Sequence, residues 1–186
     1  MYSTADFKKG LKIVFNGDPY EIIDFQHVKM GRGGAIVRTK MKNLKTGYVT
    51  ENTFRSGEKV EKPELESRDM QYLYLSEEGY IFMDNENYEQ ITVPRELVGE
   101  ATNWLIENMN VAVNFYQGKV IGVEIPTFVE LKVIETVPGI KGDTVSGGGK
   151  PAKVETGATV TVPLFVNEGD VIKIDTRTGT YIERVK

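Results

Sequence analysis

The residues of this sequence best suited to chemistry are cations set among glycines. Residues 28–42 have the sequence VKMGRGGAIVRTKMK, and from Gln26 to Thr50 there are six Lys or Arg but no Asp or Glu. Over the whole chain, by contrast, 27 acidic residues outnumber 23 basic ones. Because Arg binds phosphate in a bidentate manner and stacks on bases, a basic segment without acids favours contact with a polyanion.

This segment is expected to form a β-hairpin with Arg32 at its apex. Two β-rich runs, residues 19–29 and 34–42, flank the glycine-rich turn. Glycines supply positive φ angles and let the backbone approach a partner closely. The predicted tip and RNA-backbone contacts are Lys29, Gly31, Arg32, Gly33, Gly34, Arg38, Lys40 and Lys42. An ordinary solvated hairpin explains the same periodicity, so this alternative stays open.

Catalytic and metal-binding patterns are missing from the sequence. The chain has no cysteine, which excludes disulfides, thiolate metal sites and Cys nucleophiles. Its single histidine, His27, excludes a multi-His metal site or a His-dependent triad within one chain, and a packing or phosphate-contact role is expected for it. Residues 84–89 and 146–152 depart from the calcium-loop and phosphate-loop patterns at key positions. We therefore predict no enzyme activity, no metal and no cofactor.

The charge is unevenly spread along the chain. Residues 1–64 carry 12 cations and 8 anions, residues 65–126 carry 3 and 11, and residues 127–186 carry 8 of each. A polyanion-binding face therefore belongs to the first third, while the acidic middle should face a cationic protein or solvent. Charge asymmetry that serves solubility alone is the alternative.

The elements that position these residues are mostly short strands. Runs rich in β-branched and aromatic residues alternate with turns every eight to twelve residues, which is typical of barrels or sandwiches. Only residues 94–108 predict an amphipathic helix, with an interruption at Gly99 and with Trp104 packed on a barrel. The composition is that of a soluble globular protein, without a membrane-spanning run or an export signal, so a cytoplasmic location is expected.

Longer stretches match a known family. They are FKKGLKIVFNGDPYEIIDFQHVK, GRGGA, KNLKTGYVTENTFRSGEKVE, DMQYLYLSEEGYIFMDNENYEQI and PGIKGDTVSGGGKPAKVETGATVTVPLFVNEGDVIKIDTRTGTYIERV. Together they resemble the bacterial elongation factor P family over the whole chain. The resemblance implies an all-β fold of three small barrels in an L-shaped, tRNA-like arrangement. An SH3-like, KOW-type domain (1–64) would be followed by an OB-fold domain (65–126) and a C-terminal OB-fold domain (127–186).

The resemblance also implies a function. A member of this family would be a monomer that contacts both ribosomal subunits, binding between the peptidyl-tRNA and exit sites. It would relieve stalling at consecutive prolines by positioning peptidyl-tRNA, while the ribosome performs the chemistry.

Residue roles follow from the same resemblance. Arg32 takes the tip position that contacts the CCA end of the tRNA. In arginine-type members this residue bears a rhamnose, so an arginine-modifying glycosyltransferase is a further implied partner. Met30 stands where lysine-type members often have Pro, and Gly33 stands where arginine-type members usually have Asn. An unmodified Arg32 is therefore the alternative. Gly142, Asp143 and Thr144 match a loop that approaches messenger RNA in the exit site, although a turn held by its own side chains explains them equally well.

Two other functions remain as alternatives. An OB-type single-stranded RNA-binding protein would need a basic second or third section, and the charges given above argue against it. A paralogue of the same family with a different target is the second alternative.

Overall fold

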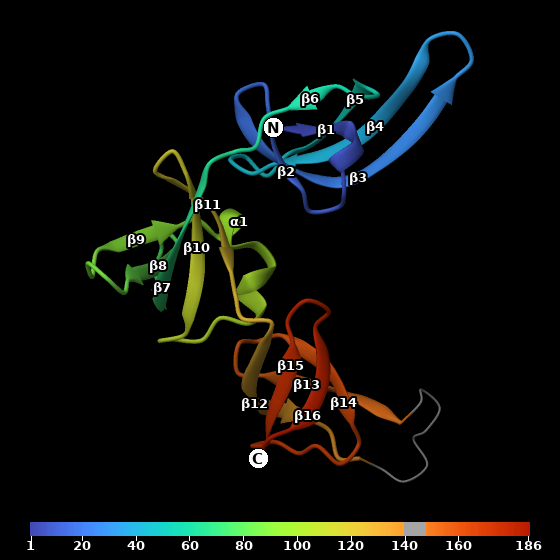
Figure 1. The fold of residues 1–186 in the computed structure, drawn as a ribbon. Helices are drawn as coiled ribbons and strands as arrows, with labels where there is room; N and C mark the ends of the chain where they lie inside the picture. Colours follow the sequence, from blue (N-terminus) through green and yellow to red (C-terminus); the bar gives the residue numbers. More distant parts are fainter. Residues whose placement is uncertain (140–147) are drawn as a thin grey trace. The chain divides into compact units, whose positions relative to one another are not determined.

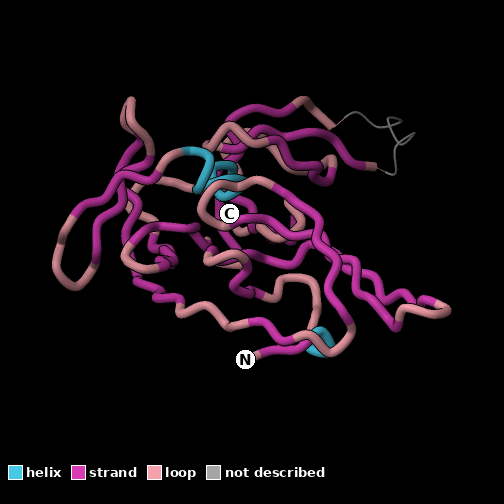
Figure 2. The backbone as a smooth tube through the Cα atoms, turned by 90° about the horizontal axis from the view of Figure 1, so that it is seen from above, coloured by secondary structure: helices cyan, strands magenta, loops and turns pink. Residues whose placement is uncertain are grey.

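The fold is seen in a computed structural model of the 186-residue chain, which describes residues 1–139 and 148–186. The predicted messenger-RNA loop, Gly142 to Thr144, lies outside the described residues. Strands dominate the described chain, and helical turns are brief segments between them (Figure 1, Figure 2).

The described chain forms two compact units. One contains residues 1–68 and 113–122, and the other contains residues 69–112 and 123–186. This division differs from the three domains predicted from the sequence, so the domain boundaries stay a prediction.

The first sheet is built around a long hairpin. Its elements are β1 (Tyr2–Ser3), the 3-10 turn η1 (Thr4–Asp6), β2 (Lys12–Phe15), β3 (Asp18–Met30), β4 (Gly34–Asn43), β5 (Val49–Arg55) and β6 (Lys59–Val60). The strand order is β2-β3-β4-β5, and β1 pairs separately with β6. Because β3 has 13 residues and β4 has 10, their hairpin extends past the neighbouring strands, as the blue ribbon in Figure 1 shows.

Alternation along the strands builds the core of this sheet. Val37 and Met41 of β4 are fully buried, together with Ile13 and Ile22 of the preceding strands. Phe54 of β5 closes the core, and its side chain is 3% exposed. Every second side chain of a strand thus points into the core, while the residues between them point to the opposite face.

The second sheet is rich in aromatic residues. Its elements are β7 (Leu65–Leu75), β8 (Tyr80–Asp84), β9 (Gln90–Val93), the helical turns α1 (Arg95–Val98) and η2 (Gly99–Asn103), β10 (Asn110–Tyr116) and β11 (Lys119–Glu124). The strand order is β11-β10-β7-β8-β9. Tyr72 and Phe82 are cross-strand partners, and their ring centroids are 5.4 Å apart. Such aromatic pairs supply much of the packing in a small barrel.

The predicted helix over residues 94–108 is shorter than expected. Its first turn ends at Gly99, which has φ 62°, and only a 3-10 turn continues to Asn103. The positive φ at Gly99 breaks the α-helical path, as the sequence predicted. Trp104 and Leu105 follow the last turn and are buried, so tertiary packing takes over where helical periodicity had suggested another turn.

The third sheet has five strands. They are β12 (Phe128–Thr136), β13 (Gly149–Val154), β14 (Thr159–Pro163), β15 (Val171–Asp175) and β16 (Thr180–Arg184). The order is β14-β13-β12-β15-β16, and β14 also lies against β16, which gives the sheet its barrel-like closure. Val129, Leu131 and Val133 of β12 fill the core with side chains that alternate along the strand.

Trp104 packs into the core of this third sheet. Its side chain is 6% exposed and belongs to the cluster that contains Val129 and Leu131. Gly179 lies beside the indole, since a Cβ at position 179 would be 3.5 Å from the ring. The prediction that Trp104 packs on a barrel is confirmed.

The predicted all-β fold is also confirmed by these sheets. None of the helices that the structure describes is long and apolar enough to cross a bilayer.

Candidate nucleic-acid interface

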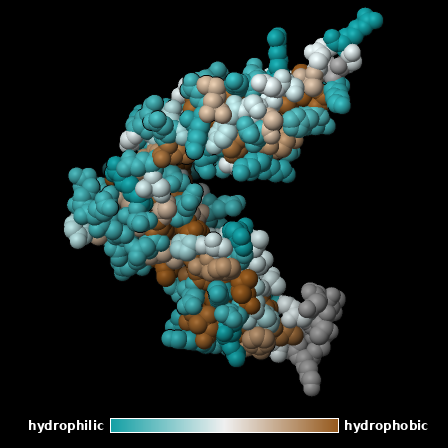
Figure 3. All heavy atoms as spheres, viewed as in Figure 1, coloured by the Kyte–Doolittle hydropathy of each residue, from teal (hydrophilic) through white to brown (hydrophobic). Residues whose placement is uncertain are grey.

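The predicted hairpin carries Arg32 at its far end. β3 and β4 stay in register up to the pair Met30 and Gly34, and residues 31–33 form the turn. Arg32 is exposed, and Figure 3 shows hydrophilic atoms projecting from the far end of the hairpin, among residues of intermediate hydropathy. Gly34 has φ 75°, a conformation that favours glycine, whereas Gly31 lies in open space with an ordinary φ. The hairpin prediction is confirmed.

Register separates the predicted cations into two groups. Arg38, Lys40 and Lys42 alternate with the buried Val37 and Met41, so they share the outer face of the sheet. Lys29, however, pairs with Ala35, which lies on the same face as Val37. Cross-strand partners point to one face, so Lys29 lies on the opposite side of the hairpin from the other three. The four predicted cations therefore do not share one face of the hairpin.

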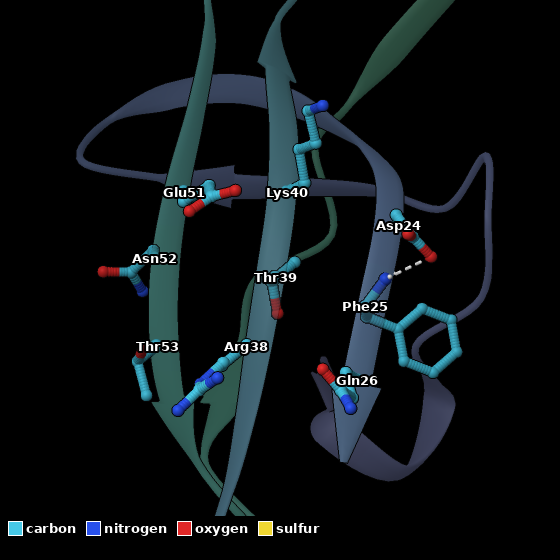
Figure 4. A pocket seen from close by; sticks show the side chains of 9 residues that line it. All are labelled: Asp24, Phe25, Gln26, Arg38, Thr39, Lys40, Glu51, Asn52 and Thr53. Carbon is cyan, nitrogen blue, oxygen red and sulfur yellow. Dashed lines mark hydrogen bonds between the residues drawn. The ribbon is translucent and has the colours of Figure 1, made fainter. Parts of the chain in front are cut away.

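Acidic side chains lie beside two of the outer-face cations. Lys40 has Asp24 as its partner on β3 and Glu51 as its partner on β5, and Lys42 has Glu21 on β3. Figure 4 shows Lys40 between Glu51 and Asp24. The outer face therefore has mixed charge near the barrel. Residues 26–50 contain no acid, but acids that lie just before and just after them in the sequence are their neighbours in the sheet.

These carboxylates also have partners on β2 and in the loop before it. Asp24 lies 3.9 Å from the Lys9 ammonium and accepts a hydrogen bond from the backbone N–H of Phe25 at 3.0 Å. Glu21 lies 4.0 Å from the ammonium of Lys12. Cations and carboxylates thus alternate across this end of the face, an arrangement that weakens its attraction for phosphate.

Toward the tip the outer face loses its acids. Arg38 has the uncharged Gln26 and Thr53 as its cross-strand partners. One step nearer the tip, Arg55 of β5 pairs with Ile36 on the same face and is exposed. Arg55 was missed as a site residue. The alternation around the buried Phe54 was the signal that could have found it, because it points position 55 outward.

A shallow groove lies on the sheet where β3, β4 and β5 run side by side (Figure 4). It is lined by Asp24, Phe25, Gln26, Arg38, Thr39, Lys40, Glu51, Asn52 and Thr53. The lining combines guanidinium, ammonium, amide and hydroxyl donors with the carboxylates of Asp24 and Glu51. Such donors suit the phosphate oxygens and sugars of a nucleic acid better than an apolar ligand.

His27 lies on the inner face of the hairpin, opposite Val37. It is exposed, and its ring stands perpendicular to that of Phe25 with centroids 5.6 Å apart. This is the packing contact expected of it, and its exposed position leaves the predicted phosphate contact available.

Models of three protein domains match successive parts of the chain. They are described as "Elongation factor P (EF-P) KOW-like domain" over residues 3–60, "Elongation factor P (EF-P) OB domain" over residues 65–123, and "Elongation factor P, C-terminal" over residues 129–184. Elongation factor P from Thermodesulfovibrio yellowstonii is 59% identical over 186 residues, with both chains fully covered. The chain belongs to the elongation factor P family.

A second relative agrees with this assignment, and a solved structure has a similar fold. Elongation factor P from Pelotomaculum thermopropionicum is 57% identical over 185 residues and covers all of both chains. A solved structure titled "Eukaryotic translation initiation factor 5A from Methanococcus jannaschii" is similar in fold, with a TM-score of 0.54 and 24% identity. It covers 66% of this chain and 92% of its own.

Membership of the elongation factor P family confirms the predicted combination of KOW-type and OB-fold barrels. It also establishes the chain as a translation elongation factor, and this class of protein implies an interaction with the ribosome. The hypothesis of a generic single-stranded RNA-binding protein is not needed to explain any of the three matched domains.

Proposed function

We propose that the chain binds the ribosome between the peptidyl-tRNA and exit sites and stimulates peptide bond formation at consecutive prolines. The single observation that carries this proposal is the position of Arg32. It lies exposed at the end of a hairpin whose last residues extend past the strands on either side. A cation held in this way can reach a nucleic-acid terminus that the body of the barrel cannot approach.

The proposed mechanism is positioning rather than chemical catalysis. Proline is a poor nucleophile and a rigid peptidyl donor, so a badly placed peptidyl-tRNA slows bond formation. Contact between Arg32 and the CCA end would restrict the motion of that terminus. Orientation of reacting groups contributes several kcal/mol to many reactions, which is enough to relieve a stall.

The tip residues divide into two roles in this proposal. Gly31, Gly33 and Gly34 form the exposed turn that lets the backbone approach RNA, and Lys29 supplies charge on the inner face. Arg38 supplies charge on the outer face, where no acid is its cross-strand partner. Lys40 and Lys42 have a minor part, because carboxylates lie beside them.

Several further assignments accompany this function. The partners we propose are both ribosomal subunits, peptidyl-tRNA, and messenger RNA in the exit site, the last through Gly142, Asp143 and Thr144. We also propose that the chain acts as a monomer in the cytoplasm and has no enzyme activity of its own. A single histidine and the lack of cysteine support the last point.

Arg32 is also the proposed acceptor of a rhamnose. Its exposed guanidinium is accessible to an arginine-modifying glycosyltransferase. A sugar at this position would lengthen the tip and add hydroxyl groups that can hydrogen-bond to the CCA end.

The proposed function is tested with reconstituted translation of a reporter that contains three consecutive prolines. Adding the chain should raise the yield of full-length product and remove the ribosome stall at the proline run. A reporter with alanines in place of the prolines should respond little. A proline reporter that translates equally well without the chain would instead favour a paralogue with a different target.

A further inference from the structure

Two arginines lie next to each other on the outer face of the first sheet. Arg38 of β4 is paired with Thr53 of β5, and Arg55 of β5 is paired with Ile36 of β4. The arginines are therefore diagonal neighbours on adjacent strands and point to the same side. Side chains in this relationship start about 7–8 Å apart, which is within reach of long side chains. Both guanidinium groups can thus approach one small anion.

No carboxylate is the direct cross-strand partner of either arginine, and Glu51 is only a diagonal neighbour of Arg38. In the part of the chain that the structure describes, no ion pair involves Arg38 or Arg55. The cross-strand partners of Arg38 are the uncharged Gln26 and Thr53. Glu58 is close to Arg55 along the chain, but the bond between them joins the Glu58 backbone N–H to the Arg55 carbonyl at 2.9 Å.

Lys40 differs from the two arginines in its cross-strand partners. Lys40 lies on the same face, one step farther from the tip, and has a carboxylate on each side. Like charges on neighbouring strands destabilise a sheet, so the fold gains nothing from an unpaired arginine pair at this position. An anion bound between the guanidinium groups would remove this cost.

The chemistry of the neighbouring side chains selects phosphate. Arginine presents a planar fork that matches phosphate oxygens, and two forks can hold one phosphate from two sides. The amide of Gln26 and the hydroxyl of Thr53 flank Arg38 and can donate further hydrogen bonds. Contacts of this kind fix the position of a nucleic acid without reading its sequence.

We propose that Arg38 and Arg55 together bind a backbone phosphate of the tRNA whose CCA end Arg32 reaches. The site rests on the proposed function and deepens it by adding a second anchor behind the tip. Arg55 is the new residue, and Lys40 and Lys42 are excluded from the anchor. Arg32 then positions the terminus, while the arginine pair fixes the angle at which the hairpin meets the tRNA.

The test measures the affinity of the full chain for ribosomes that carry peptidyl-tRNA, over a range of salt concentrations. Arg38→Gln and Arg55→Gln should each weaken binding roughly ten-fold, the size expected for one charge-assisted hydrogen bond. Loss of one phosphate contact should also make the salt dependence less steep, by about 0.9 in the slope of log K against log salt. Because both arginines hold the same phosphate, the double variant should lose less than the product of the single effects.

Lys40→Gln is the matched control, since it removes one exposed cation from the same face. It should change affinity by less than about two-fold, because Lys40 has a carboxylate as its cross-strand partner on each side. Arg38→Lys and Arg55→Lys should give intermediate losses, since the charge remains while the fork is lost. All variants should keep the melting temperature of the native chain.

Three results would overturn the proposal. They are native affinity and salt slope in both arginine variants, an equal loss in Lys40→Gln, and equal losses on vacant ribosomes, which would assign the arginines to another anionic surface. The Arg32→Ala variant tests the proposed function separately from the arginine-pair site. If Arg32→Ala loses activity at prolines while Arg55→Gln binds normally, only the arginine-pair site fails.

Discussion

Lys40 and Glu51 lie directly opposite each other on β4 and β5, and Asp24 is the partner of Lys40 on the other side. A residue that belongs to the most basic segment of the sequence therefore has a carboxylate as its cross-strand partner on each side. The cationic character of the first sheet is concentrated toward the tip of the hairpin. This gradient decides which residues we expect RNA to contact.

Removing Glu51 should strengthen binding to RNA. Glu51→Gln leaves Lys40 with one acidic neighbour instead of two, so we expect about a two-fold gain in affinity for tRNA at low salt and a steeper salt dependence. The loss of the cross-strand pair should cost about 0.2–1 kcal/mol of stability. Fluorescence anisotropy with labelled tRNA measures the affinity. Glu89→Gln, at an exposed position of the acidic second section, is the control, and an equal gain there would reject local neutralisation at Lys40.

Trp104 should be essential for the stability of the third sheet. Trp104→Ala removes a large buried side chain from the core around Val129 and Leu131, and a loss of about 3–5 kcal/mol is expected. Hydrogen exchange of the amides in β12 and β15 measures this loss locally. Tyr88→Ala, at a position that is 70% exposed, should change stability by less than about 0.5 kcal/mol. Unchanged protection of β12 in Trp104→Ala would contradict the packing.

The loop between β4 and β5 should respond to acid through Asp18. The Asn43 side-chain amide donates to this carboxylate at 3.2 Å and the Lys45 ammonium at 3.3 Å, and these bonds lower the pKa of Asp18. A lowered pKa means that the stabilising contribution is present above the ordinary pKa of the group. It is lost as the pH falls through the lowered pKa of the folded state.

Carbon-detected NMR titration of the Asp18 carboxyl group tests this. Asn43→Ala should move the pKa back up, because the Asn43 bond is its largest cause, and Lys45→Ala should move it up by less. In parallel, the stability difference between the native chain and Asp18→Asn should shrink as the pH falls. A pKa that does not change in Asn43→Ala would show that the amide bond is not responsible.

The state of Arg32 can be read from the mass of the native protein. If the chain carries a rhamnose, the proteolytic peptide that contains Arg32 should be heavier by one deoxyhexose, and Arg32→Lys should remove the addition. A peptide of unmodified mass from the native source would reject rhamnosylation, and a functional unmodified arginine would then be the remaining explanation.

Local patterns in the sequence predicted much of the fold. The glycine-rich turn between two β-rich runs placed Arg32 at the end of a hairpin, and the alternating pattern of β4 is the one that buries Val37 and Met41 in the structure and exposes the cations between them. Both features depend on residues that are neighbours in the chain. Gly99 similarly marked the interruption of the short helix.

The candidate interface was harder to predict because it depends on register. Lys29 changed sides, Lys40 and Lys42 acquired acidic neighbours from β3 and β5, and Arg55 joined the outer face from another strand. A count of charges along the chain contains none of these cross-strand relationships. Trp104 likewise left the helical pattern because its indole packs in the core of the third sheet.

The central claim, that Arg32 positions peptidyl-tRNA, is tested most directly by the rate of peptide bond formation on ribosomes stalled at three consecutive prolines. The measurement compares the native chain, Arg32→Ala, and Lys62→Ala as a control at another exposed cation of the first unit, each at saturating concentration. We predict that Arg32→Ala lowers the rate roughly 10–100-fold toward that without the factor, while Lys62→Ala acts like the native chain. A rate for Arg32→Ala equal to that of the native chain would contradict the account.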